Sequence, residues 1–99
     1  MTFTTKLGTA KGTPRSRIWI EGARLIDAGF TAKETRFRKE WTSNQLCLIA
    51  DPDGEAKTSG KASKPIIDIT GRKVATFFDG FTHVEVTYSP GLITIKGAE

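Results

Sequence analysis

The sequence predicts a mostly β fold with short helices, built from two strand–helix–hairpin repeats that share one core. The chain has 99 residues, which suits a single small domain. Two segments of alternating isoleucines, Ile18–Ile20 and Ile67–Ile69, are each followed two residues later by a glycine. Between them, residues 51–64 contain no Val, Leu, Ile, Met or aromatic side chain. These observations divide the chain into residues 1–14, 15–50, 51–64 and 65–97.

The first repeat, residues 15–50, begins with a half-buried strand in which every second side chain is apolar. A short helix over residues 23–28 follows, and Gly29 can end it with the left-handed dihedrals that glycine adopts readily. A β-hairpin completes the repeat, with residues 36–41 turning at Asn44 into residues 46–49.

The second repeat, residues 65–97, has the same order of elements: a strand at 67–69, a short helix at 73–78, and a hairpin of 83–88 and 92–95. Landmarks recur in the same order, namely Leu25 and Val74, Gly29-Phe30 and Gly80-Phe81, Phe37 and Val84, Trp41 and Tyr88, and residues 46–48 and 93–95. We interpret this as an internal duplication, with chance similarity as the alternative. One repeat is too small to cover its apolar face, so we expect the two to pack together.

The segments outside the repeats are expected to be mobile. Residues 1–14 form a predicted flexible basic arm, and residues 51–64 form a predicted linker that cannot offset its ordering entropy by burial. The net charge is +4, and residues 1–17 carry Lys6, Lys11, Arg15 and Arg17 without any acid. The arm therefore suits a phosphate backbone or another anionic surface, with a solubilising tail as the alternative.

Several protein classes are excluded by composition. The single cysteine, Cys47, allows no intrachain disulfide and no thiolate zinc site. No apolar run approaches the ~20 residues of a membrane span, and the first twelve residues lack the apolar region of a secretory signal. We therefore expect a cytoplasmic protein without a cofactor or a membrane partner.

The first repeat resembles a known family. Ile18-x-Ile-x-Gly-x-x-Leu25, then Ala28-Gly-Phe30 and a hairpin ending in Leu-x-Leu, is similar to the SymE-type toxin module of the AbrB/MazE-like swapped-hairpin family. The second repeat departs from it, because Phe77, Phe78 and Asp79 replace an Ala-rich elbow. The resemblance implies a barrel of two interleaved units, normally a dimer and here a single-chain pseudo-dimer. It also implies nucleic-acid binding, or a toxin acting on RNA or the nucleoid.

Basic residues supply the candidate phosphate contacts. If Phe37 and Trp41 face the core, Arg36 and Arg38 form an outward pair roughly 7 Å apart, with a solvated, charge-protected strand as the alternative. Arg24 and Arg72-Lys73 follow the strand-ending glycines, and we expect them to share one face. The complete candidate set is Arg15, Arg17, Arg24, Arg36, Arg38, Arg72 and Lys73.

Trp19 alternates away from its isoleucine neighbours and is the candidate anchor for a base or a protein partner. The alternative is that it packs beneath the N-terminal arm. Catalysis has little support, because Cys47 is expected to be an inert core thiol and His83 is the only histidine. Asp51, Asp53 and Glu55 lack the full calcium-loop pattern.

The sequence therefore favours a small DNA- or RNA-binding protein, present as a monomeric pseudo-dimer or a homodimer. The alternative is a small phage or mobile-element protein that binds and inhibits a host protein. A toxin-type ribonuclease is the third candidate, supported only by the resemblance.

Overall fold

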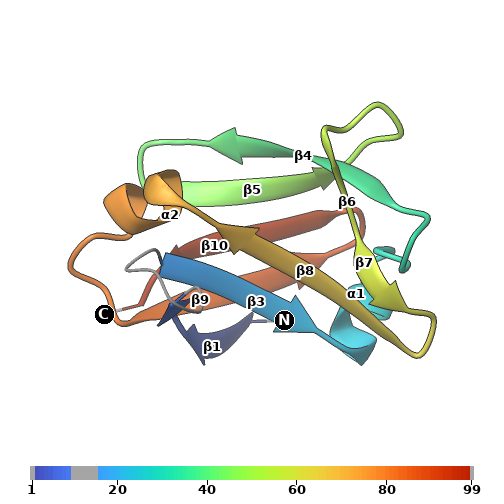
Figure 1. The fold of residues 1–99 in the computed structure, drawn as a ribbon, viewed down its shortest axis with the longest axis horizontal. Helices are drawn as coiled ribbons and strands as arrows, with labels where there is room; N and C mark the ends of the chain where they lie inside the picture. Colours follow the sequence, from blue (N-terminus) through green and yellow to red (C-terminus); the bar gives the residue numbers. More distant parts are fainter. Residues whose placement is uncertain (1, 10–15, 99) are drawn as a thin grey trace.

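Two antiparallel sheets packed face to face form the molecule. The computed structural model describes residues 2–9 and 16–98 (Figure 1). The six-stranded sheet has the order β1-β9-β10-β5-β4-β6, and the four-stranded sheet has the order β2-β3-β8-β7. The strands are β1 Thr2–Lys6, β2 Gly8–Thr9, β3 Ser16–Glu21, β4 Arg36–Trp41, β5 Gln45–Ala50, β6 Ala56–Lys57, β7 Ser59–Lys61, β8 Lys64–Thr70, β9 His83–Ser89 and β10 Leu92–Gly97.

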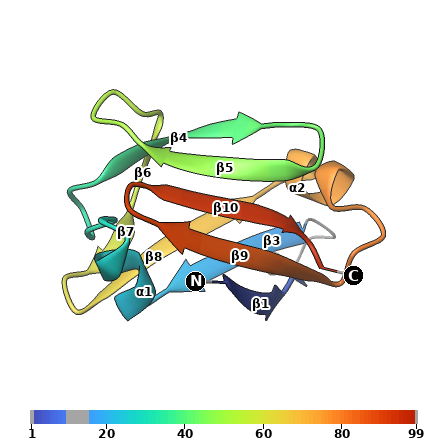
Figure 2. The ribbon, with the colours of Figure 1, turned by 180° about the vertical axis from the view of Figure 1, so that it is seen from behind.

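The predicted mostly β class with short helices is confirmed, whereas the predicted closed barrel is wrong. The strands form two separate sheets instead of one continuous cylinder. The helices α1 (Ala23–Asp27) and α2 (Arg72–Phe77) lie at opposite ends of the molecule (Figures 1 and 2). Each follows a glycine with a positive φ, Gly22 at 100° and Gly71 at 126°, a backbone region that favours glycine.

The core lies between the sheets and follows the predicted alternation. The inward isoleucines of β3 and β8 are at most 6% exposed, and the inward leucines of β5 and isoleucines of β10 are fully buried. Phe30 and Phe37 fill one part of the interior edge to face, with ring centroids 6.0 Å apart. The described core cluster is Ile18, Ile20, Leu25, Ala28, Phe30, Phe37, Leu46, Leu48, Ile67, Ile69, Val74, Phe78, Val84, Val86, Ile93 and Ile95.

The strand pairing has a two-fold pattern. In β3 and β8, Ile18 pairs with Ile69 and Ile20 with Ile67. In β5 and β10, Leu46 pairs with Ile95 and Leu48 with Ile93. If each residue is exchanged with its counterpart in the other half, the same pairs result. The counterparts are Ile18 and Ile67, Ile20 and Ile69, Leu46 and Ile93, and Leu48 and Ile95. Exchanging β1–β5 with β6–β10 likewise reproduces both strand orders in reverse.

The N-terminal segment is ordered where a flexible arm was predicted. Residues 2–6 form β1 and pair with β9, residues 8–9 form β2 and pair with β3, and the Leu7 N–H donates to the Thr82 carbonyl at 2.9 Å. These residues form strands because their backbone pairs with β9 and β3, and the β-propensity of threonine favours that pairing. Residues 10–15, including Arg15, lie outside the described residues.

Residues 51–64 contain short strands in the segment predicted to be a linker. They contain β6, β7 and the start of β8, and the Thr58 N–H donates to the Thr35 carbonyl at 2.9 Å. Gly54 packs directly on the backbone of Phe37, where an added Cβ would lie 2.3 Å from the carbonyl carbon. The segment is held by backbone contacts, which do not require the large apolar side chains it lacks.

Cys47 is not a core thiol, in contrast to its predicted position. Leu46 and Leu48 are buried, and alternation places Cys47 on the outer face, opposite Glu40 and Thr94. It is partly exposed, and the amide nitrogen of Gln45 lies 3.8 Å from its sulfur. None of the described helices is long and apolar enough to cross a membrane.

Candidate functional site

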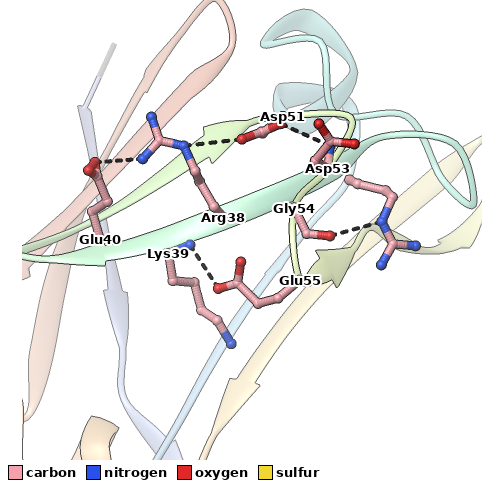
Figure 3. A network of polar contacts seen from close by, with 8 residues as sticks. Arg38, Lys39, Glu40, Asp51, Asp53, Gly54 and Glu55 are labelled. Atoms are coloured by element: carbon pink, nitrogen blue, oxygen red, sulfur yellow. Dashed lines mark hydrogen bonds and ion pairs between the residues drawn. The ribbon is translucent and has the colours of Figure 1, made fainter.

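The predicted arginine pair on β4 faces outward but is surrounded by acids and carbonyls. The Arg38 guanidinium contacts Glu40 at 2.9 Å and Asp51 at 3.3 Å (Figure 3). The Nε of Arg36 donates to the Gly54 carbonyl at 2.9 Å. An anionic ligand here would compete with partners that the protein already supplies.

Lys39 adds a backbone contact to the same network. Its N–H donates to the Glu55 carboxylate at 3.1 Å (Figure 3). Hydrogen bonds from the backbone N–H groups of Glu55 and Lys39 lower the pKa of Glu55, so this carboxylate stays ionised at neutral pH. The surface around β4 is therefore mixed in charge.

Trp19 is exposed on the outer side of β3, as the alternation predicts. It is 39% exposed, and the guanidinium carbon of Arg17 lies 4.4 Å from its ring centroid. Arg17 is oriented by two hydrogen bonds of 2.8 Å to Asp68, and this hydrogen bonding raises its pKa. A planar cation stacked on an indole gives a flat surface that combines positive charge with a π system.

Arg24 makes a second stack of the same kind. Its guanidinium carbon lies 3.4 Å from the ring centroid of Phe3. The Phe3 and Tyr88 rings meet edge to face at 6.0 Å. Burial raises the pKa of Tyr88, and the Arg24 charge acts in the opposite direction. Both rings come from the pair of strands at one edge of the larger sheet.

These stacks border a groove between β1 and β3, which we name the β1–β3 groove. It has a volume of about 260 Å³ and is lined by Phe3, Thr4, Thr5, Trp19, Ile20, Glu21, Arg24, Val86 and Tyr88. A smaller pocket of about 160 Å³, the end pocket, shares three of these residues and is lined by Phe3, Arg24, Asp27, Ala28, Tyr88, Ser89 and Pro90. The linings of the groove and the pocket together contain three aromatic residues, one base and two acids, namely Phe3, Trp19, Tyr88, Arg24, Glu21 and Asp27. A third hollow of about 420 Å³ lies beside α2 and is lined by Ser43, Asn44, Phe77, Phe78, Phe81, Glu85, Lys96 and Gly97.

The structure brings together only part of the predicted set. Arg17, Trp19 and Arg24 lie at or beside the β1–β3 groove. Arg72 and Lys73 belong to α2 at the other end of the molecule, so the predicted shared face with Arg24 is wrong (Figure 1). The junction of Gly22 with α1 and the junction of Gly71 with α2 are equivalent positions of the two halves. The two-fold pattern places equivalent positions at opposite ends of the molecule. The Lys73 amino group lies 5.0 Å from the Trp41 ring centroid.

Two residues of the groove were missed by the sequence reasoning. Phe3 stood in a segment expected to be mobile, although it is the only aromatic residue among the first eighteen. The sequence indicates Tyr88 only as the counterpart of Trp41 in the second hairpin. An aromatic side chain inside a Thr-rich segment was the available signal for β1, because that composition favours a strand.

The part of the chain described here contains no group of three or more His, Cys, Asp or Glu side chains suited to a metal ion. His83 Nδ1 lies 2.9 Å from the hydroxyl of its neighbour Thr82. Comparisons with protein-family models, curated proteins and solved structures found no match for this chain.

Proposed function

We propose that the protein binds a single strand of nucleic acid along the β1–β3 groove. The observation that carries this proposal is the presence of two arginines stacked on aromatic rings, Arg17 on Trp19 and Arg24 on Phe3, beside one hollow. Aromatic rings and guanidinium planes stack on nucleobases, and arginine donors hold phosphates. Arg17 already donates to Asp68, so it contributes the stacked plane, and Arg24 supplies the donors for a phosphate. The same short surface offers both kinds of contact.

A single strand fits the charges better than a duplex does. Arg36 and Arg38 of β4 already have carbonyl or acidic partners, which leaves few groups to neutralise the phosphates of a double helix. Splayed bases can instead use Trp19, whose exposed ring has no role in the core. Stacking supplies affinity that does not depend on counterion release.

We further propose that the two halves are SymE/AbrB-like swapped-hairpin repeats in one chain. The symmetric registers of β3 with β8 and of β5 with β10 support this assignment. The pairing of β1 with β9 and of β4 with β6 supports it too, because each joins the leading strand of one half to the hairpin of the other.

The experiment is fluorescence anisotropy with a labelled twelve-nucleotide dT strand and a matched duplex at 50–200 mM salt. We expect Trp19→Ala to weaken strand binding about tenfold, since stacking contributes about 1–3 kcal/mol per base. Arg24→Ala should weaken it and reduce the salt slope by about 0.7, the value for one phosphate contact on a single strand.

Arg72→Ala is the matched control, because it removes the same charge from the equivalent helix at the other end. It should bind like the unmodified protein. Equal affinities for the Arg24 and Arg72 variants, or no strand binding at 50 mM salt, would contradict the proposal.

A protein partner is the second candidate, favoured by the position of β1 at the open edge of its sheet. An extended segment could pair with that edge and use Trp19 as an anchor. In that case Trp19→Ala would abolish partner binding while the protein showed no affinity for the dT strand.

A further inference from the structure

The end pocket differs from the hollow at the other end of the molecule because the two ends carry different side chains at one matched position. The buried residues of the two helices are Leu25 in α1 and Val74 in α2. Three residues later, the first half has Ala28 and the second half has Phe77. The Phe77 ring lies edge on to Trp41, with centroids 5.1 Å apart. Beside Tyr88, the counterpart of Trp41, the small Ala28 leaves the space open.

The size and walls of the end pocket suit a flat aromatic ring. Its volume is about 160 Å³, close to the roughly 150 Å³ of a cavity that holds one benzene molecule, so it has room for the six-membered ring of a purine but not for both rings. Phe3 and Tyr88 supply aromatic walls that meet at 67°. It opens beside the β1–β3 groove, with which it shares these two residues and Arg24.

One carboxylate gives this pocket a preference among the bases. Asp27 lines the pocket and forms no ion pair with any described residue, although Arg24 is three residues earlier on the same helix. An ionised carboxylate accepts hydrogen bonds and donates none. Guanine presents two adjacent donors, N1–H and the N2 amino group, on one edge, whereas adenine presents a lone pair at N1.

We propose that the end pocket takes a guanine base, with the Asp27 carboxylate accepting both donors and the ring lying against Phe3 and Tyr88. This inference rests on the proposed function and names the base that the bound strand places there. Arg24, at the junction of pocket and groove, contacts the adjoining phosphate.

The test uses twelve-nucleotide dT strands with one central guanine, hypoxanthine or adenine. Because a bidentate contact discriminates by about 1–3 kcal/mol, we expect guanine to bind about tenfold more tightly than adenine, with hypoxanthine between them because it lacks the amino group. Asp27→Asn should remove this order, and Ala28→Phe, which copies the filled end, should remove it as well. The measured quantity is the ratio of the guanine and adenine affinities within each variant, because Asp27→Asn also removes a negative charge beside the strand and should raise its affinity for every strand.

The Asp27 variant keeps the test valid if Ala28→Phe does not fold, since Asp27 is exposed. Free GMP separates the two proposals. One outcome is that the unmodified protein binds GMP, the Asp27 variant does not, and neither protein binds any strand. That outcome supports the guanine pocket and contradicts the proposed function. If strands bind with equal affinity for all three bases, the guanine pocket is wrong and the proposed function stands.

Discussion

Replacing Thr58 by Val should make the protein more stable. The Thr58 side chain is 1% exposed, and its hydroxyl oxygen has no hydrogen-bond partner among the described residues. Its backbone is fully engaged, because the N–H donates to the Thr35 carbonyl at 2.9 Å and the carbonyl accepts from the Lys33 N–H at 2.8 Å. Valine keeps these backbone bonds and the β-branched shape, and replaces only the hydroxyl by a methyl group.

The magnitude follows from the desolvation of the hydroxyl. Leaving a buried polar group unpaired costs about 1–3 kcal/mol, so removing it should raise the free energy of unfolding by about 1 kcal/mol. For a domain of 60–100 residues this corresponds to an increase in Tm of about 4–8 °C. The gain should be independent of ionic strength, since no charge changes.

Thermal unfolding followed by circular dichroism, together with urea titration, measures the effect. Thr58→Ser is the matched control: it keeps the hydroxyl and removes the methyl group, so it should lower the free energy of unfolding by about 1 kcal/mol. If the Val variant were no more stable than the original and the Ser variant were unchanged, the hydroxyl must be satisfied or exposed, and the reasoning would be refuted.

Two further predictions concern how the halves are joined. Gly54→Ala should lower the free energy of unfolding by about 2 kcal/mol or more, because the new Cβ would meet the Phe37 backbone at 2.3 Å. Chemical denaturation measures this change. An unchanged denaturation midpoint would contradict the close packing. Residues 1–50 and 51–99, expressed separately, should each lack fixed tertiary structure and regain near-ultraviolet circular dichroism on mixing. Four of the eight pairings between described strands connect the two pieces, and a folded, monomeric 1–50 fragment would contradict this prediction.

The sequence predicted those parts of the fold that depend on side-chain alternation. The isoleucines at 18, 20, 67 and 69 are buried as expected, and the β4–β5 and β9–β10 hairpins form where they were predicted. The same rule, applied strictly, would have placed Cys47 on the outer face. Segments held by backbone contacts were missed, because Gly54 and the residues of β1 carry no pattern of large apolar side chains.

The candidate site was harder to predict because its contacts join distant segments. Arg17 and Asp68 are 51 residues apart and meet only through the register of β3 with β8. Arg24 meets Phe3 because β1 pairs with a strand of the other half. No local window of the sequence contains either relation, so the sequence could not show that Arg17 is paired with an acid or that Arg24 lies against an aromatic ring beside the groove.

The difference between Ala28 and Phe77 has a consequence for stoichiometry. A symmetric homodimer would present two identical ends, both open or both filled. In this single chain the two ends differ: Ala28 lines the end pocket, whereas Phe77 packs on Trp41 at the matched position and lines a differently shaped hollow beside α2. Under the proposed function, a ligand of the end pocket would bind once per chain, and a strand that places a base there would run in one direction along the adjoining groove.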